Sequence, residues 1–100
     1  MSFRLEFTAA AAMQLEAAAA WWRANRDAAP DLFDEELAHA IGLLAKMPTS
    51  ARVWREIEGK DVRKARLPRT RYTLFFTIDE DIVTVHAVWH GGRGSLPPLE

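Results

Sequence analysis

The spacing of apolar residues changes once along this chain, near Pro48-Thr49-Ser50, and this change constrains the fold more than any other feature. Before it, apolar residues recur mostly at helical spacing; after it, they occur in short segments typical of strands. A chain of 100 residues accommodates one modest core. We therefore expect a single domain over residues 1–100, with residues 91–100, rich in glycine and proline, as an irregular tail.

The first half predicts a short strand and two helices. Residues 3–8 alternate apolar and polar side chains, which is the pattern of a half-buried strand. The alanine-rich sequence that follows favours a helix over residues 9–27, with Thr8 at its N-cap. After a proline break, we expect Asp31 to cap a second helix that ends at about Lys46. Because the link is short, the two helices should form an antiparallel hairpin.

The second half predicts four strands joined by tight turns. These strands are expected over residues 53–57, 62–67, 71–78 and 82–89. Each strand can bury one face against the helical hairpin. The chain is therefore expected to be a two-layer α+β domain, in which an N-terminal strand and a helical hairpin pack on an antiparallel meander.

Composition excludes several classes of protein and site. The chain has no cysteine, so disulfides and thiolate metal sites are ruled out. The three histidines have no metal-ligand spacing, and we expect no metal and no cofactor. No apolar run approaches the ~20 residues of a membrane-spanning helix, and the N-terminus lacks a signal-peptide pattern. These features predict a cytoplasmic protein with no membrane partner.

The charge distribution is more informative than the total charge. Eight basic and three acidic residues lie between Arg52 and Arg71, so this stretch is net +5 in a chain of net -1. Such a block suits a partner that carries phosphates or carboxylates. The alternative is a solvated strand pair whose long side chains cover the sheet.

Strand alternation predicts which side chains share a face. In the last strand, it turns Ala87 and Trp89 toward the core and Val88 outward, and Tyr72 in the neighbouring strand also faces the core. The face away from the helices is expected to carry the following residues, with Arg93 just beyond the strand end: Lys64, Arg66, Arg71, Phe75, His86 and His90.

This residue set has a chemistry suited to nucleic acid. Arginine and lysine hold phosphates and stabilise developing negative charge. His90 could move a proton near neutral pH, and Phe75 could stack on a base. Nothing in the local sequence distinguishes His39 or His86, and a histidine on a strand is more often a surface or packing residue than a catalyst.

Trp21 and Trp22 are adjacent on the first predicted helix, so their side chains point about 100° apart. One of them could cover a protein interface, where aromatic residues are enriched. The alternative, which we favour, is that the hairpin packs one against the sheet and the other against the second helix.

Two runs, VRKARLPRTRYTLFF over residues 62–76 and IVTVHAVWHGGR over residues 82–93, resemble the RelE/ParE toxins of type II toxin–antitoxin systems. The order of elements and the Leu32-Phe33 start of the second helix also fit this superfamily. The resemblance implies a RelE/ParE-like fold, a cognate antitoxin that neutralises the chain and a toxin–antitoxin hetero-oligomer.

The superfamily has two branches, which imply different targets. The RelE-like branch cleaves messenger RNA on the ribosome, and it would here use Arg66, Arg71, His90 and Arg93. The ParE-like branch poisons DNA gyrase. RelE-like nucleases typically add a tyrosine or histidine toward the C-terminus, and no tyrosine follows Arg93. This departure favours the ParE-like branch and binding over catalysis; the third alternative is a protein-binding module without toxicity.

Overall fold

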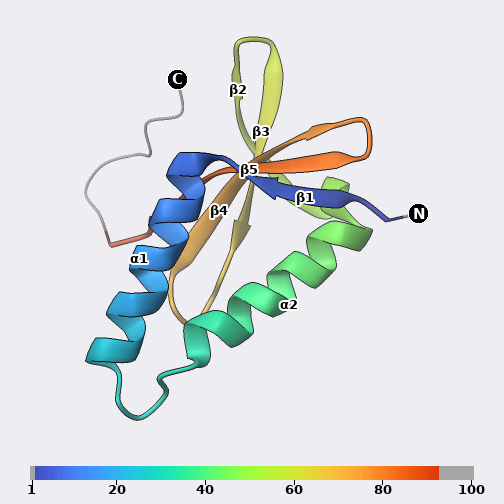
Figure 1. Cartoon of the computed structure of the whole chain (residues 1–100). Helices are drawn as coiled ribbons and strands as arrows, with labels where there is room; N and C mark the ends of the chain where they lie inside the picture. The colour runs from blue at the N-terminus through green and yellow to red at the C-terminus, as the bar shows by residue number, and fades with distance from the viewer. Residues whose placement is uncertain (1, 93–100) are drawn as a thin grey trace.

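The computed structural model describes residues 2–92, in which two helices lie across one face of a five-stranded sheet (Figure 1). In chain order, the elements are β1 (Arg4–Phe7), α1 (Ala9–Asn25), α2 (Leu32–Lys46), a short 3-10 turn (Pro48–Ser50), β2 (Arg52–Ile57), β3 (Lys60–Arg66), β4 (Tyr72–Asp79) and β5 (Ile82–His90). The expected α+β architecture is confirmed, and each element lies within about two residues of its predicted range. The predicted tail from residue 93 onward lies outside the described residues.

The two helices begin in different ways. The Thr8 hydroxyl accepts a hydrogen bond from the backbone N–H of Ala11 at 3.1 Å, so the predicted N-cap of α1 is confirmed. Asp31 occupies the predicted N-cap position of α2, but its side chain makes no capping hydrogen bond. The acidic first turn of α2, with Asp34 and Glu35, still complements the helix dipole. Neither helix is long and apolar enough to cross a membrane.

The sheet has the strand order β1-β5-β4-β3-β2. Strands β2 to β5 form the predicted antiparallel meander, whereas β1 joins the other edge parallel to β5. Glu58 and Gly59 form the two-residue turn of the β2–β3 hairpin, and both have positive φ (53° and 81°). A two-residue turn with positive φ at both residues matches the right-handed twist of the strands that it joins. The sheet is therefore mixed, and the sequence pattern did not indicate the parallel pairing.

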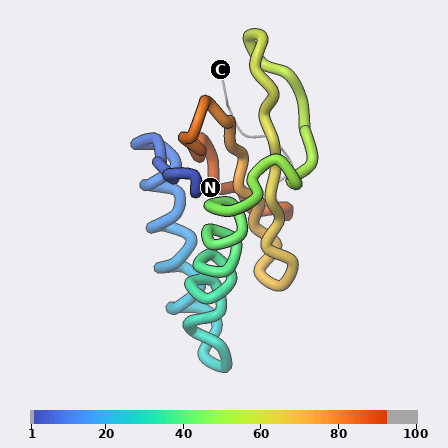
Figure 2. The backbone as a smooth tube through the Cα atoms, turned by 90° about the vertical axis from the view of Figure 1, so that its right-hand side faces the viewer, coloured from blue at the N-terminus to red at the C-terminus, as the bar shows by residue number. Residues whose placement is uncertain are grey.

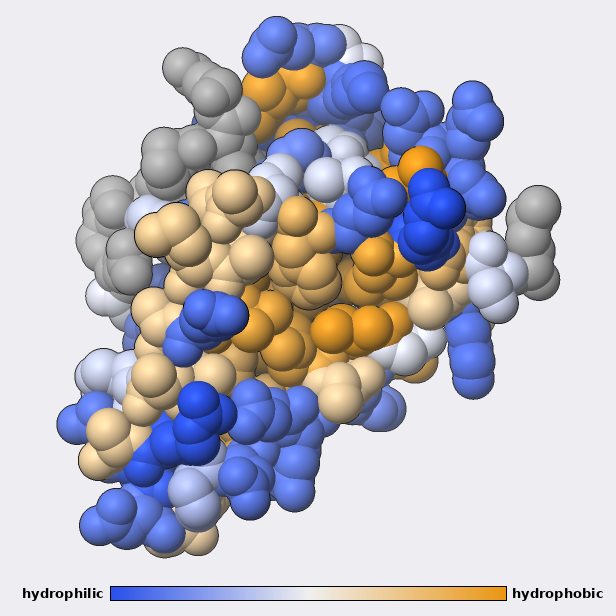
Figure 3. All heavy atoms as spheres, in the orientation of Figure 1, coloured by the Kyte–Doolittle hydropathy of each residue, from blue (hydrophilic) through white to orange (hydrophobic). Residues whose placement is uncertain are grey.

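Helices and strands form two layers, which Figure 2 shows from the side. We call the sheet face that the helices cover the helix face, and the opposite one the far face. The main core lies between the layers, where Trp22, Phe33 and Leu44 from the helices meet buried side chains of the central strands, including Phe76 and Val85. Figure 3 shows apolar residues gathered over the middle of the helical side and hydrophilic residues around it.

A second, smaller core lies on the far face. Val62, Phe75 and Ala87 are buried there, and Trp54, Ile57 and Trp89 pack against them. Trp54 shares the face of Arg52 by ordinary alternation, and Ile57 joins it there because the β2–β3 register shifts between Val53 and Arg55. The far face is therefore partly covered by its own aromatic side chains, which the sequence analysis did not anticipate.

A bulge in β5 corrects the predicted faces of its last residues. Phe76 pairs with Val85 while Phe75 pairs with Ala87, so His86 is an extra residue on β5. One extra residue reverses the alternation beyond it. Val88 lies on the helix face, and so does His90, which pairs with Tyr72. Ala87 and Trp89 pack on the far face. The predicted faces of these four residues were wrong, while those of Tyr72, Val83 and Val85 are confirmed.

Candidate functional site

The basic residues of the central strands line one depression of about 650 Å³ on the far face. Its cations come from β2, from β3 and from the loop before β4, and its remaining walls are Thr73 and the two glycines after β5. The lining residues are Arg52, Lys64, Arg66, Arg71, Thr73, Gly91 and Gly92. We call this surface the basic depression.

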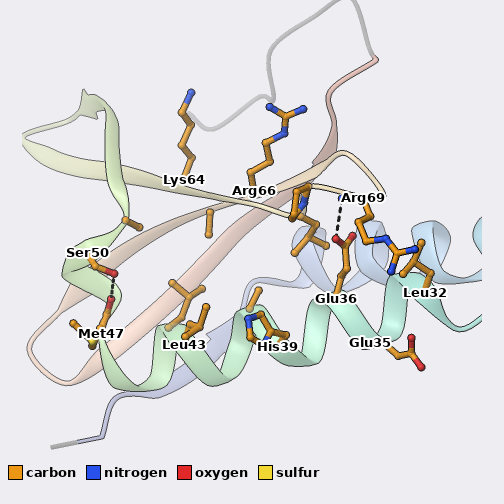
Figure 4. Close-up of a pocket in the computed structure, with 16 residues that line it drawn as sticks. Leu32, Glu35, Glu36, His39, Leu43, Met47, Ser50, Lys64, Arg66 and Arg69 are labelled. Carbon is orange, nitrogen blue, oxygen red and sulfur yellow. Dashed lines mark hydrogen bonds between the residues drawn. The ribbon is translucent and has the colours of Figure 1, made fainter.

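Strand register explains why these side chains meet. Arg52 is the cross-strand partner of Lys64, and Arg66 is the partner of Thr73. Lys64 and Arg66 are two residues apart on β3 and therefore share a face. Figure 4 shows both side chains extending from β3 away from α2. The sequence prediction that Lys64, Arg66 and Arg71 lie together is thereby met in the structure.

The cations of the basic depression are not neutralised within residues 2–92. The ion pairs of this part of the chain join Arg4 to Glu6, Arg23 to Asp34 and Lys60 to Asp79, all outside the depression. Four like charges in one concavity repel one another and raise the local potential. Binding of an anionic partner would relieve that repulsion.

Arg71 lies in an unusual backbone conformation just before β4, not within the strand as predicted. Its φ of 68° is in the left-handed region, which non-glycine residues seldom adopt. Its N–H donates to the carbonyl of Leu67, and its carbonyl accepts from the N–H of Gly91, each at 2.8 Å. These bonds fix the backbone from which the Arg71 side chain enters the depression.

Glu36 of α2 holds the same loop from the helical layer. Its carboxylate accepts hydrogen bonds from the backbone N–H groups of Arg69 and Thr70 and from the Thr70 hydroxyl, each at 2.8 Å. Burial alone would raise the pKa of Glu36, but these hydrogen bonds and the charge of Arg69 lower it below its usual value. Sequence reasoning missed Glu36, because no local pattern links it to a loop more than thirty residues away.

Two predicted members of the far-face set are not available to a ligand in the basic depression. His90 is on the helix face, with its ring edge-to-face against Tyr72 at 4.9 Å, and its Nδ1 accepts from the N–H of Gly92 at 2.9 Å. Phe75 is on the far face but only 6% exposed, under Trp54 at a centroid distance of 4.6 Å. His90 is therefore not on the face of the basic depression, and Phe75 is not free to stack on a base. Arg93 lies outside the described residues.

His86 faces outward, as predicted, because it follows the core-facing Val85 and the bulge changes only the faces of the residues after it. Its Nε2 is 2.9 Å from the Thr77 hydroxyl, and it borders a cavity lined also by Glu58, Lys60 and Val62. Burial, and secondarily the charge of Lys60, lower the pKa of His86. The ring is therefore held neutral at neutral pH, in a position separate from the basic depression.

The two tryptophans of α1 have different environments. Trp22 is 8% exposed, and its indole N–H donates to the carbonyl of Ala29 at 2.7 Å. Trp21 is 46% exposed and lies near the guanidinium of Arg26. Our preference for two packed tryptophans was wrong, and Trp22 is too buried to contact a partner, which leaves Trp21 as the accessible one.

A further concave surface is a groove between α2 and β3 (Figure 4). Its floor includes Ala40 and Ala65, and its helical wall carries Leu43 and Met47, which are 56% and 64% exposed. Lys64, Arg66 and Arg69 also line it, on the strand side. Sequence reasoning missed this groove, although Leu43 and Met47 stand outside the apolar stripe of α2 and were the available signal.

Metal chemistry has no counterpart in the described part of the chain. Within residues 2–92, no group of three histidine or acidic side chains is placed to hold an ion.

Comparison with known proteins gives the family. Residues 5–94 match the family model described as the ParE toxin of the type II toxin–antitoxin system parDE. A solved structure described as the chromosomal ParDE TA system from P. aeruginosa has the same fold, with a TM-score of 0.68 and 17% identity over 89% of this chain and 96% of that one. Curated protein sequences gave no match. Because the family match spans most of the chain, this protein belongs to the ParE toxin family of type II toxin–antitoxin systems.

Proposed function

We propose that this toxin inhibits DNA gyrase in the cytoplasm and is neutralised there by a cognate antitoxin. Membership in the ParE family supports both parts. The observation that carries the choice of binding over cleavage is the bulge at His86. It turns His90 to the helix face, so the basic depression gathers Arg66 and Arg71 without an imidazole from residues 2–92. Cations without a positioned acid or base suit recognition of an anionic surface better than phosphodiester cleavage.

The test of the gyrase proposal is a supercoiling assay with purified toxin and purified gyrase. We expect inhibition of supercoiling and accumulation of cleaved DNA held by the enzyme. An Arg66→Gln/Arg71→Gln variant should weaken inhibition, whereas Lys46→Gln, which removes an exposed charge at the end of α2, should not. Full supercoiling activity at saturating wild-type toxin would contradict the proposal.

The α2–β3 groove is our proposed seat for the antitoxin. Its exposed leucine and methionine suit the apolar side chains of a bound segment, and Arg69 on its strand side suits an acidic one. Lys64 and Arg66 line both the groove and the basic depression, and their side chains extend away from α2, so a segment that continues from the groove across β3 would also cover part of the depression. This arrangement would let one partner block the surface that meets the target.

Antitoxin binding can be tested with the protein encoded by the adjacent reading frame. Leu43→Glu and Met47→Glu should each weaken binding by about fivefold or more, because loss of an interface anchor costs more than about 1 kcal/mol. Val53→Glu is the matched control, since Val53 is an exposed apolar residue (41%) that does not line the groove. Equal loss with Val53→Glu would place the antitoxin elsewhere.

Two alternatives make different predictions. A RelE-like toxin would cut translated messenger RNA, detected by primer extension, and Arg66→Gln would remove the cuts. A protein-binding module without toxicity would leave growth unchanged when the chain is induced in a bacterial host. Either result, in place of gyrase inhibition, would overturn the proposed target.

A further inference from the structure

Arg71 has a backbone conformation that suits glycine better than arginine. It is the last residue of the loop from β3 to β4, which closes where the N–H of Leu67 donates to the carbonyl of Tyr72 at 2.7 Å. Its φ of 68° brings its Cβ close to the following carbonyl oxygen, a steric cost that glycine does not have. A residue that keeps such a conformation despite its cost is a candidate for a functional role.

Contacts from two distant parts of the chain hold this conformation. The carbonyl of Arg71 accepts from the N–H of Gly91 at 2.8 Å, and a Cβ at residue 91 would lie only 3.2 Å from the same oxygen. From the helical layer, Glu36 accepts hydrogen bonds from the N–H and the hydroxyl of Thr70, the residue before Arg71. The loop is therefore fixed by α2 on one side and by the segment after β5 on the other.

Electrostatics also oppose the position of Arg71. It lines the basic depression together with Arg52, Lys64 and Arg66, and the ion pairs of residues 2–92 leave all four cations without an acidic partner. A fourth cation beside three others adds repulsion. Backbone and charge thus both disfavour an arginine here, and sequences break such rules mainly at functional sites. An oxyanion from outside the chain would offset both costs.

We propose that Arg71 is the residue of the basic depression that binds an oxyanion of the partner, and that Glu36, acting through Thr70, is its positioning residue. A guanidinium binds a phosphate or a carboxylate through two parallel hydrogen bonds. Such contact demands a fixed orientation, which the tethered loop supplies before the ligand arrives. The inference rests on the proposed function only in taking the depression as a contact surface, and it adds which residues set the affinity of that surface.

The charge of Glu36 separates positioning from simple electrostatics. Removal of a carboxylate makes the surface more positive, so by charge alone Glu36→Ala should strengthen the binding of an anion. Loss of the loop anchor should instead weaken binding, because Arg71 is no longer held in place. The two effects have opposite signs, so the direction of the change distinguishes them.

The first experiment replaces Arg71 by glycine. Urea unfolding should give a higher midpoint than the wild type, because glycine relieves both the steric cost and the repulsion. Isothermal titration calorimetry of the full-length toxin at low salt, with tripolyphosphate and with polyglutamate, should show binding weakened about tenfold or more, because a charge-assisted hydrogen bond is lost. Higher stability with lower affinity is the signature of a residue kept for binding, and the anion that the wild type binds more tightly identifies the oxyanion as phosphate or carboxylate.

Glu80→Gly is the matched control for the backbone. Glu80 has a φ of 55° in the turn between β4 and β5, and it does not line the depression. Glycine at this position should also raise the urea midpoint. The affinity for either anion should not fall.

A double-mutant cycle tests the positioning role of Glu36. Glu36→Ala should weaken anion binding about threefold or more in the wild type and in Arg66→Gln, but not in Arg71→Gln, where the residue it positions is already gone. Glu35→Ala, which removes an exposed carboxylate from the same turn, should not weaken binding. Thermal unfolding checks that each variant is folded at the titration temperature. If Glu36→Ala is not, Thr70→Val replaces it, because that change removes the hydroxyl donor to Glu36.

Four results would overturn the inference. They are no binding of either anion by the wild type, a lower urea midpoint for Arg71→Gly, unchanged anion affinity in that variant, and an equal effect of Glu36→Ala with and without Arg71. Because gyrase is absent from these assays, their failure leaves the proposed target to the supercoiling assay, and failure of that assay leaves these results in place.

Discussion

The carboxylate of Glu36 on α2 accepts two hydrogen bonds from Thr70, one from its backbone N–H and one from its hydroxyl, each at 2.8 Å. Thr70 is 1% exposed and is the buried polar residue among those described. The contact ties the helical layer to the loop that leads into Arg71. It therefore links the stability of the fold to the shape of the basic depression.

Replacement of Glu36 by alanine should destabilise the protein by about 1–3 kcal/mol, because it leaves the buried donors of Thr70 without an acceptor. Urea unfolding of the two proteins measures this difference. Glu35→Ala is the matched control, since Glu35 is exposed in the same turn of the helix. A similar loss in both variants would mean that the effect comes from the helix and not from the loop.

The same carboxylate should make stability depend on pH. The hydrogen bonds from Arg69 and Thr70 hold the folded pKa of Glu36 below the ordinary value of 4.5. The unfolded chain therefore takes up the proton first, and the contribution of Glu36 is fully present above pH 4.5 and is lost as pH falls through the folded pKa. Urea unfolding from neutral to acid pH should show the difference between wild type and Glu36→Ala shrinking below that value. A constant difference would contradict the assignment.

His86 should titrate below the ordinary histidine value of 6.5, since burial and then the charge of Lys60 disfavour its protonation. The unfolded chain binds the proton first here too, so stability should fall as pH drops from 6.5 toward the folded pKa. NMR titration of the ring gives the midpoint directly. Lys60→Gln should move that midpoint upward. A midpoint at or above 6.5 in the wild type would contradict the expectation that burial lowers the pKa of His86.

Trp22→Ala should cost about 3–5 kcal/mol, as expected for removal of a buried large side chain, and it also removes the hydrogen bond to Ala29. Trp21→Ala should cost far less, because nearly half of that side chain is already in water. Chemical denaturation compares the two adjacent substitutions on one helix. Comparable losses would mean that Trp21 is packed more tightly than its exposure indicates.

The local sequence predicted the elements well, because their signals are short-range. Alanine-rich sequence behind Thr8 forms α1, and the alternating segments form the strands of the meander. Alternation also placed Lys64 and Arg66 on the far face, since β3 keeps an unbroken register with β4 there. These predictions needed only the period of the backbone.

Which strands pair, and in what register, could not be predicted from the alternation of residues along each strand. The edge strand β1 ends where Phe7 pairs with Val85, and α1 begins directly after it. Beyond that point, β5 has no strand on this side, and the N–H of Val88 donates instead to the side-chain oxygen of Gln14 at 2.7 Å. The bulge at His86 lies at this change of neighbours, and no residue in the sequence of β5 marks it.

The sequence by itself therefore determined the layers, the strands and the cationic part of the candidate site, because backbone periodicity and charge are properties of local sequence. Tertiary structure decided that His90 faces the helices, that Trp89 joins the far face and that Glu36 holds the loop before Arg71. The physical reason is the same in each case. One extra residue in a strand reverses every face beyond it, and a carboxylate finds its donors only when two distant segments have packed together.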